Sequence, residues 1–419
     1  MPWLVATALL HSAIVVEKRD TLKSWTVLLA IIAFSFSLLG TFIVRSGIIT
    51  SVHAFATDPE RGMFILMFLA LVIGGSFLLF ALRSDRLQAG GLFAPASRES
   101  GLVINNLFLS VAAAVVLYGT LHPLISDALF NVKSSVGAPF FNLVFGYLMI
   151  PLVLVMGIGV HLKWKRANLW QVAGRLKAIA GLSVLAALMT LYITYGGEIM
   201  PAVWMGIGVW LLLSMLQELG QRIKLFQVPL GNSFGRLFRQ PRSSWGMSLG
   251  HLGFAVGLIG IVATSSWNLE EQKVMSIGDK MTIGEFQLTL DDVVAIAGPN
   301  YSAVRGIISV TNLDGASFMA YPESRTYISS PMTTTEGAVE TSLSGDLFIV
   351  IGDAQSQDLG QSQRPGRWGV RVYYKPMQIW LWIGATIMVI GGIISLSDRR
   401  YRIGSPQVKK SSRKPVHVR

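Results

Sequence analysis

Residues 25–44, WTVLLAIIAFSFSLLGTFIV, form a stretch of twenty residues without a charged side chain. A helix of this length rises about 30 Å, which matches the hydrocarbon thickness of a bilayer. Further apolar runs of spanning length lie near 63–82, 102–121, 141–161, 173–195, 200–217, 246–264 and 377–397. We therefore expect a mainly α-helical, polytopic integral membrane bundle of about nine spans, in which the first run, residues 2–16, is truncated.

Composition and charge support this fold class. Of the 419 residues, 52% are hydrophobic and 14% charged, which is less charge than soluble domains carry. If residue 1 lies outside, the inner connections 17–24, 83–101, 162–177 and 218–245 hold 16 Lys and Arg, and the outer ones hold three. The positive-inside rule then places the basic tail, 398–419, in the cytoplasm. These loops account for the net charge of +12, so no nucleic-acid partner is expected.

Residues 265–376 interrupt the apolar pattern with 13 acidic and 8 basic residues. The runs VMSIGDKMTI, FQLTLDDVVAI, RGIISVTNL and DLFIVIGD alternate with period two between turn residues. We expect an inserted extracytoplasmic, periplasmic β-rich domain, a barrel or a sandwich. The predicted domains are a bundle of eight spans at 1–264, the β-rich domain at 265–376, a last transmembrane helix at 377–397 and the tail at 398–419.

Two histidines lie well inside apolar spans, where an ionisable side chain is costly and by default indicates function. His11 is six residues before Glu17 at the inner end of its span, and His251 is six residues after Trp245 at the inner end of another. At about 1.5 Å per residue, both lie roughly 9 Å from the cytoplasmic edge. Two imidazoles at one depth could bind the two faces of one haem iron. The alternative is two separate histidines satisfied by neighbouring carbonyls or hydroxyls.

Five glycines share one face of the helix around His251, and that histidine lies about 140° from the centre of their stripe. They are Gly246, Gly250, Gly253, Gly257 and Gly260. We expect this face to pack closely against another helix rather than to line a ligand pocket.

On the outer side, Arg45 ends the span that contains residues 25–44, and His53 follows in the loop. Together they could supply a guanidinium for a haem propionate and an axial imidazole, although Arg45 could also simply extend to the headgroups. His122, followed by Pro123, is expected to end the fourth span and to be solvated there. The chain has no cysteine, which excludes thiolate metal sites and covalent haem attachment to it.

The chain resembles the CcmF family, the haem lyase subunit of system I cytochrome c maturation. The resemblance lies in MPWLVATALLHS at 1–12, residues 23–62 with the specific motif TSVHAFATDP, WGMSLGHLGFAVGLIGI at 245–261 and FMAYPESRTYI at 318–328. It implies an enzyme subunit of the bacterial inner membrane that receives haem from the chaperone CcmE. This subunit promotes thioether attachment of haem to apocytochrome c, with CcmH-type thiol partners. It also implies that His11 and His251 hold an internal haem b, with a quinol as a candidate electron donor, and that His53 ligates the transferred haem.

The sequence departs from the family pattern by lacking the tryptophan-rich WWD segment, which should precede residue 1. We therefore expect the C-terminal portion of CcmF, as a fragment or a split-gene product, acting with the missing N-terminal part. One alternative is a proton-coupled secondary transporter, because paired intramembrane histidines also serve as proton relays. The other is a noncatalytic scaffold of the maturation complex.

Overall fold

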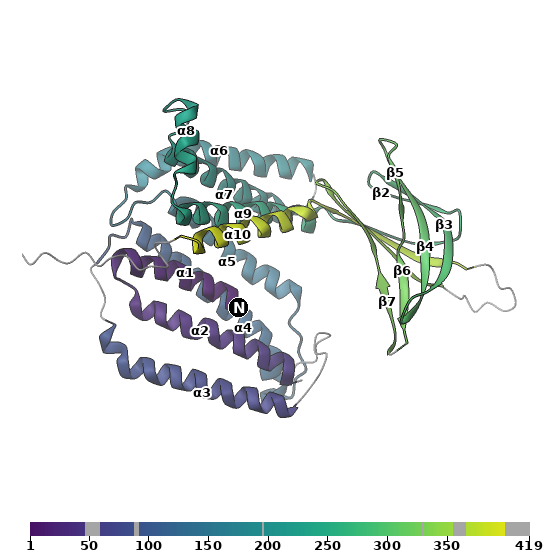
Figure 1. The fold of residues 1–419 in the computed structure, drawn as a ribbon, viewed down its shortest axis with the longest axis horizontal. Helices are drawn as coiled ribbons and strands as arrows, with labels where there is room; N and C mark the ends of the chain where they lie inside the picture. The colour runs from purple at the N-terminus through teal and green to yellow at the C-terminus, as the bar shows by residue number, and fades with distance from the viewer. Residues whose placement is uncertain (47–58, 88–91, 195–196, 329, 355–365, 399–419) are drawn as a thin grey trace, which may run out of the picture. The chain divides into compact units, whose positions relative to one another are not determined.

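The computed structural model describes residues 1–46, 59–87, 92–194, 197–328, 330–354 and 366–398 (Figure 1). Within these ranges, eight helices are long and apolar enough to cross a membrane, and two β-sheets lie in the chain between the seventh and the eighth of them. The predicted class, a helical membrane bundle with a β-rich insertion, is confirmed. The chain divides into two compact units, residues 1–183 with 213–218 and residues 184–212 with 219–419.

The helices that precede the sheets correspond to the apolar runs, with one addition, α8. They are α1 (Pro2–Arg19), α2 (Lys23–Ser46), α3 (Pro59–Arg83), α4 (Arg98–Phe130), α5 (Ala138–Gly159), α6 (Leu169–Ile193), α7 (Ile199–Ile223), α8 (Leu230–Phe238) and α9 (Arg242–Ser266), with a 3₁₀ turn at Ser84–Arg86. In the first unit α1 packs against α2 and α4, α2 packs against α3, and α4 packs against α5. The turn after α1 is closed by Asp20, which has a left-handed backbone and donates its N–H to the carbonyl of Val16.

The expectation that His122 ends its span is wrong, because α4 continues through Pro123 to Phe130. Pro123 has no N–H for the carbonyl one turn earlier, that of Gly119. At Gly119 the helix lies close to the rings of Phe140 and Phe141, since an added Cβ would be only 2.8 Å from the second. A proline removes one helical hydrogen bond, and packing of this kind can hold the helix together around it.

In the second unit α9 packs against α10 (Gln378–Leu396). A Cβ on Gly253 would lie 2.5 Å from the carbonyl oxygen of Gly384, and a Cβ on Gly246 would lie 2.5 Å from Cβ of Ser395. Only glycine allows the two backbones to approach so closely. The predicted packing surface is thus confirmed at Gly246, Gly253 and Gly260, with α10 as the partner, whereas a Cβ on Gly250 would meet no atom within 4 Å.

The β-rich domain is a sandwich of two antiparallel sheets. One has the strand order β1-β10-β9-β8 and the other β2-β3-β4-β6-β7, with β5 paired to β4. The strands are β1 (Leu269–Met275), β2 (Lys280–Ile283), β3 (Phe286–Ala297), β4 (Tyr301–Asn312), β5 (Ser317–Ala320), β6 (Glu323–Tyr327), β7 (Ser330–Glu336), β8 (Ala338–Thr341), β9 (Gly345–Ala354) and β10 (Trp368–Pro376).

The sandwich core comes from the period-two residues of both sheets. In one sheet Leu288 and Leu290 of β3 pair with Val310 and Ile308 of β4, and all four side chains are buried. Buried aliphatic residues of β9 and β10, among them Ile351, come from the other sheet. Alternation of buried and exposed residues along each strand is the pattern that a sandwich requires.

Candidate functional site

His251 lies on α9 and is half-buried. Its Nδ1 is 2.7 Å from the carbonyl oxygen of Met247, one turn earlier in the same helix. A carbonyl oxygen can only accept a hydrogen bond, so Nδ1 carries the ring proton. The neutral ring therefore has its lone pair on Nε2, which is the arrangement that metal-ligating histidines use.

The segment of α9 that holds His251 is tied to its neighbours by polar contacts at its N-terminal end. The buried carboxylate of Asp398 accepts a hydrogen bond of 3.1 Å from the backbone N–H of Ser243. Arg242 donates to the carbonyl of Ser397 at 3.0 Å, and the Arg222 guanidinium donates to the hydroxyl of Ser248. Ser248 precedes His251 by three residues, so these contacts restrain the turns of α9 that position the His251 imidazole.

His11 lies half-buried on α1, and its Nδ1 is 3.0 Å from the side-chain amide nitrogen of Asn105 on α4. Turning the Asn105 amide by half a revolution exchanges its oxygen and nitrogen. With the nitrogen toward the ring, Nδ1 accepts and Nε2 holds the proton. With the oxygen toward the ring, Nδ1 donates and the lone pair lies on Nε2. Asn105 is thus placed to select the tautomer of His11.

Sequence reasoning missed Asn105. A signal was available, because Asn105 and Asn106 form an amide pair in the otherwise apolar run LVINNLFLS. Asn106 is buried next to α1, and its amide nitrogen lies 3.1 Å from the carbonyl of Ala8 in the orientation that satisfies its neighbours. Two consecutive amides in a span are costly unless a neighbouring helix pairs with them.

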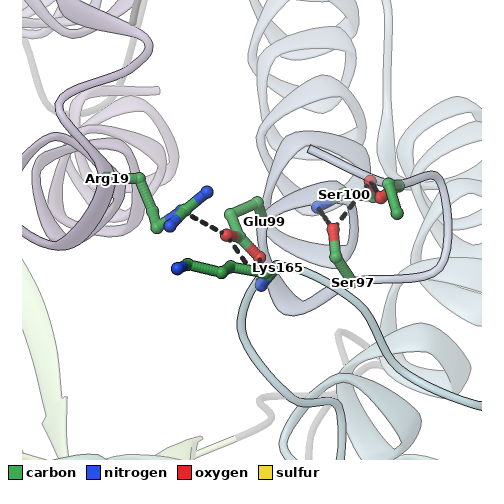
Figure 2. Close-up of polar contacts among 6 residues, drawn as sticks. Arg19, Ser97, Glu99, Ser100 and Lys165 are labelled. Atoms are coloured by element: carbon green, nitrogen blue, oxygen red, sulfur yellow. Dashed lines mark hydrogen bonds and ion pairs between the residues drawn. The ribbon is translucent and has the colours of Figure 1, made fainter. Parts of the chain in front are cut away.

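A buried carboxylate holds the C-terminal end of α1 and the N-terminal end of α4 together (Figure 2). Glu99, fully buried in the first turn of α4, forms an ion pair of 2.7 Å with Nε of Arg19 in the last turn of α1. Both of its oxygens also lie 3.0 Å from the backbone N–H of Lys165, which donates to them. Ser97 caps the same helix end by accepting from the N–H of Ser100. The cluster fixes α1 against α4, and so fixes the height at which His11 meets Asn105.

The other residues singled out in the sequence do not gather around His11 or His251 in the part of the chain that the structure describes. Arg45 is exposed in the last turn of α2, and His53 lies outside the described residues. His122 has ordinary partners on and near α4: its Nδ1 is 3.4 Å from the hydroxyl of Ser134, and its ring packs edge-on against Tyr118. His11 belongs to the first compact unit and His251 to the second.

The motif FMAYPESRTYI forms β5 and β6, where Glu323 is buried between two arginines. Arg305 and Arg325 each donate through Nε to a different oxygen of its carboxylate at 2.7 Å. Burial alone would raise the pKa of Glu323, but the hydrogen bonds and charges of Arg325 and Arg305 outweigh it and lower the pKa below its ordinary value. The Arg325 guanidinium also lies over the ring of Tyr301, 4.5 Å from its centre. This cluster holds β4 and β6 together.

Comparison with known proteins gives consistent matches. Residues 266–376 match the family described as CcmF C-terminal beta-sandwich, and residues 1–50 match the family described as Cytochrome C assembly protein. The chain is 46% identical to the cytochrome c-type biogenesis protein CycK of Rhizobium meliloti, over 97% of this chain and 59% of that protein. It is 40% identical to CcmF of Escherichia coli, over 96% of this chain and 59% of that protein.

Among solved structures, the fold matches one titled Cytochrome c Heme Lyase CcmF, with a TM-score of 0.71 and 22% identity, over 94% of this chain and 58% of the other. The chain therefore spans about three fifths of the length of the relatives that it matches.

Proposed function

Because this chain is a homologue of the CcmF and CycK cytochrome c-type biogenesis proteins along nearly its whole length, we propose that it is the haem-holding part of a membrane haem lyase. In this role it receives haem from a CcmE-type chaperone and promotes its thioether attachment to apocytochrome c. A CcmH-type thiol protein is an expected partner. The location is the bacterial inner membrane, with the basic tail in the cytoplasm.

In the proposed site, the imidazoles of His11 and His251 would hold a resident haem b. The observation that carries this proposal is the hydrogen bond from His251 Nδ1 to the Met247 carbonyl, which leaves the lone pair on Nε2. In the structure the Asn105 amide nitrogen faces His11 Nδ1, so His11 takes the same tautomer only when this amide turns and its oxygen accepts from Nδ1. A haem with two histidine ligands supplies one-electron chemistry, and a quinol is the proposed electron source. The protein residues hold and orient the imidazoles rather than transfer protons.

At the outer side we place the transferred haem, which is the substrate. His53 is the proposed axial ligand and Arg45 the proposed partner of a propionate. The exposure of the Arg45 side chain at the end of α2 is compatible with such a role. The thiols of apocytochrome c, and not a residue of this chain, form the new bonds, since the chain has no cysteine.

The test is the absorption spectrum of the full chain purified in detergent. We expect a low-spin b-type spectrum that is lost in His11→Ala and in His251→Ala, and kept in His122→Ala as the matched control. Asn105→Leu should retain the spectrum but lower haem affinity by about 10–100-fold, the usual effect of removing a partner of a ligating histidine. A purified wild-type chain without a Soret band, or one whose spectrum survives both histidine substitutions, would refute the proposal.

A further inference from the structure

The connection between α7 and α9 contains an amphipathic helix that hydropathy does not reveal. At 100° per residue, Leu230, Phe234, Leu237 and Phe238 of α8 fall within a sector of about 100°, while Arg236 and Asn232 lie on the opposite side. The apolar sector is largely exposed, with 54% of Leu230, 58% of Phe234 and 82% of Phe238 accessible. Such a face in water is unfavourable unless something covers it.

The orientation of α8 is set by contacts with the rest of its unit. Trp245 of α9 donates through its indole N–H to the carbonyl of Leu237 at 3.2 Å. Ser233 is buried, and its hydroxyl donates to the carbonyl of Lys224, in the turn after α7. The side of α8 with Ser233 thus faces the protein, together with the half-buried Leu237 at one edge of the apolar sector, whereas Phe234 and Phe238 are exposed.

The place of α8 in the chain puts it at a membrane surface. It connects the end of α7 at Ile223 with the start of α9 at Arg242, and both of these helices are candidate spans. In Figure 1, α8 runs across the direction of α7 and α9, as a helix in the membrane plane would. The exposed Phe226, in the turn before α8, adds a further aromatic residue at this level.

The charged residues in and beside α8 are all basic. Residues 219–241 contain no Asp or Glu and four basic residues: Arg222, Lys224, Arg236 and Arg239. Arg236, Arg239 and Lys224 are exposed. A helix with an apolar face and flanking arginines is typical of segments that lie at the boundary of headgroups and acyl chains, where cations attract anionic lipids.

We propose that α8 is an interfacial helix whose apolar sector inserts into the lipid boundary and whose arginines bind anionic lipid headgroups. The occupant of the exposed face is therefore the bilayer itself, on the side that the basic loops predict to be cytoplasmic. An interfacial helix between two spans would restrain the start of α9, on which His251 lies. This inference needs no haem and stands apart from the proposed lyase function.

The absence of cysteine from the chain allows single spin labels to be placed without background. Phe234→Cys labels the apolar sector, and Asn232→Cys is the matched control on the opposite side of the same helix. The full chain is reconstituted in nanodiscs of phosphatidylcholine with or without phosphatidylglycerol. The accessibility of each label is measured with oxygen, which partitions into lipid, and with an aqueous nickel chelate. Thermal stability of each labelled chain controls for folding.

With phosphatidylglycerol, we expect the label at 234 to be severalfold more accessible to oxygen than to nickel, and the label at 232 to show the reverse. Removing phosphatidylglycerol, or introducing Arg236→Gln with Arg239→Gln, should lower the oxygen accessibility of the label at 234 and raise its nickel accessibility, toward the values of the label at 232. Equal nickel accessibility at both positions would overturn the proposal, because α8 would then lie in water. Protection of position 234 from both reagents would also overturn it, since a protein, such as a second copy of this chain, would cover the face. Insertion that is independent of phosphatidylglycerol and of the arginines would refute headgroup binding.

Discussion

Replacing Gly253 with alanine is expected to force α9 and α10 apart. The added Cβ would lie 2.5 Å from the carbonyl oxygen of Gly384, about 0.9 Å inside the 3.4 Å at which ordinary contact begins. The nearest atom belongs to the backbone, so a side-chain rotation cannot relieve the overlap. Such overpacking costs about 1–3 kcal/mol. Alanine also favours a helix over glycine by roughly 0.8–1 kcal/mol, which offsets part of the loss.

Gly250 provides the matched control, because it lies on the same helix and an added Cβ there meets no atom within 4 Å. Both alanine variants gain the same helix propensity, so the difference between them isolates the overlap at position 253. We expect Gly253→Ala to be less stable than Gly250→Ala by ~1–3 kcal/mol, or ~2–6 °C in Tm. The assay is thermal unfolding of the full chain in detergent, followed by intrinsic tryptophan fluorescence. Equal midpoints, or a higher midpoint for Gly253→Ala, would refute the close packing of α9 on α10.

Two further predictions concern buried carboxylates. Glu99→Gln keeps an oxygen for the Lys165 N–H but removes the charge beside Arg19, whose side chain is 20% exposed; we expect a loss of about 3 kcal/mol. The exposed pair of Glu17 and Lys18 is the control, with Glu17→Gln costing less than about 1 kcal/mol in the same thermal assay. The pKa of Glu323 is lowered by folding, so its stabilising contribution is complete above the ordinary value of 4.5 and is lost as pH falls below it. Stability measured against pH should therefore fall less steeply below pH 4.5 in Glu323→Gln than in wild type, and parallel curves would contradict the role of the two arginines.

Local patterns predicted much of this architecture. The spans follow from the sum of hydropathy over about twenty residues, and the β domain follows from its period-two runs. The packing role of the glycine face also followed from spacing, because Gly246 and Gly253 share one side of an ideal helix whatever lies opposite. Helix α8 was not predicted, because its nine residues hold too few apolar side chains to raise the hydropathy summed over a spanning length. The continuation of α4 past Pro123 was not predicted either. Proline weakens a helix locally, but packing against other helices decides whether the helix ends there.

Hydropathy and helical geometry predict that His11 and His251 lie in apolar spans at similar depth, because both properties are local and each residue's contribution adds to that of its neighbours. They did not identify the groups that orient these rings across helices. Asn105 is 94 residues from His11, and Glu99 is also far from Arg19 in the sequence, so no helical repeat relates the members of either pair. Such contacts exist only because α1 packs against α4, and that packing depends on the shapes of whole helix faces rather than on the period of either one.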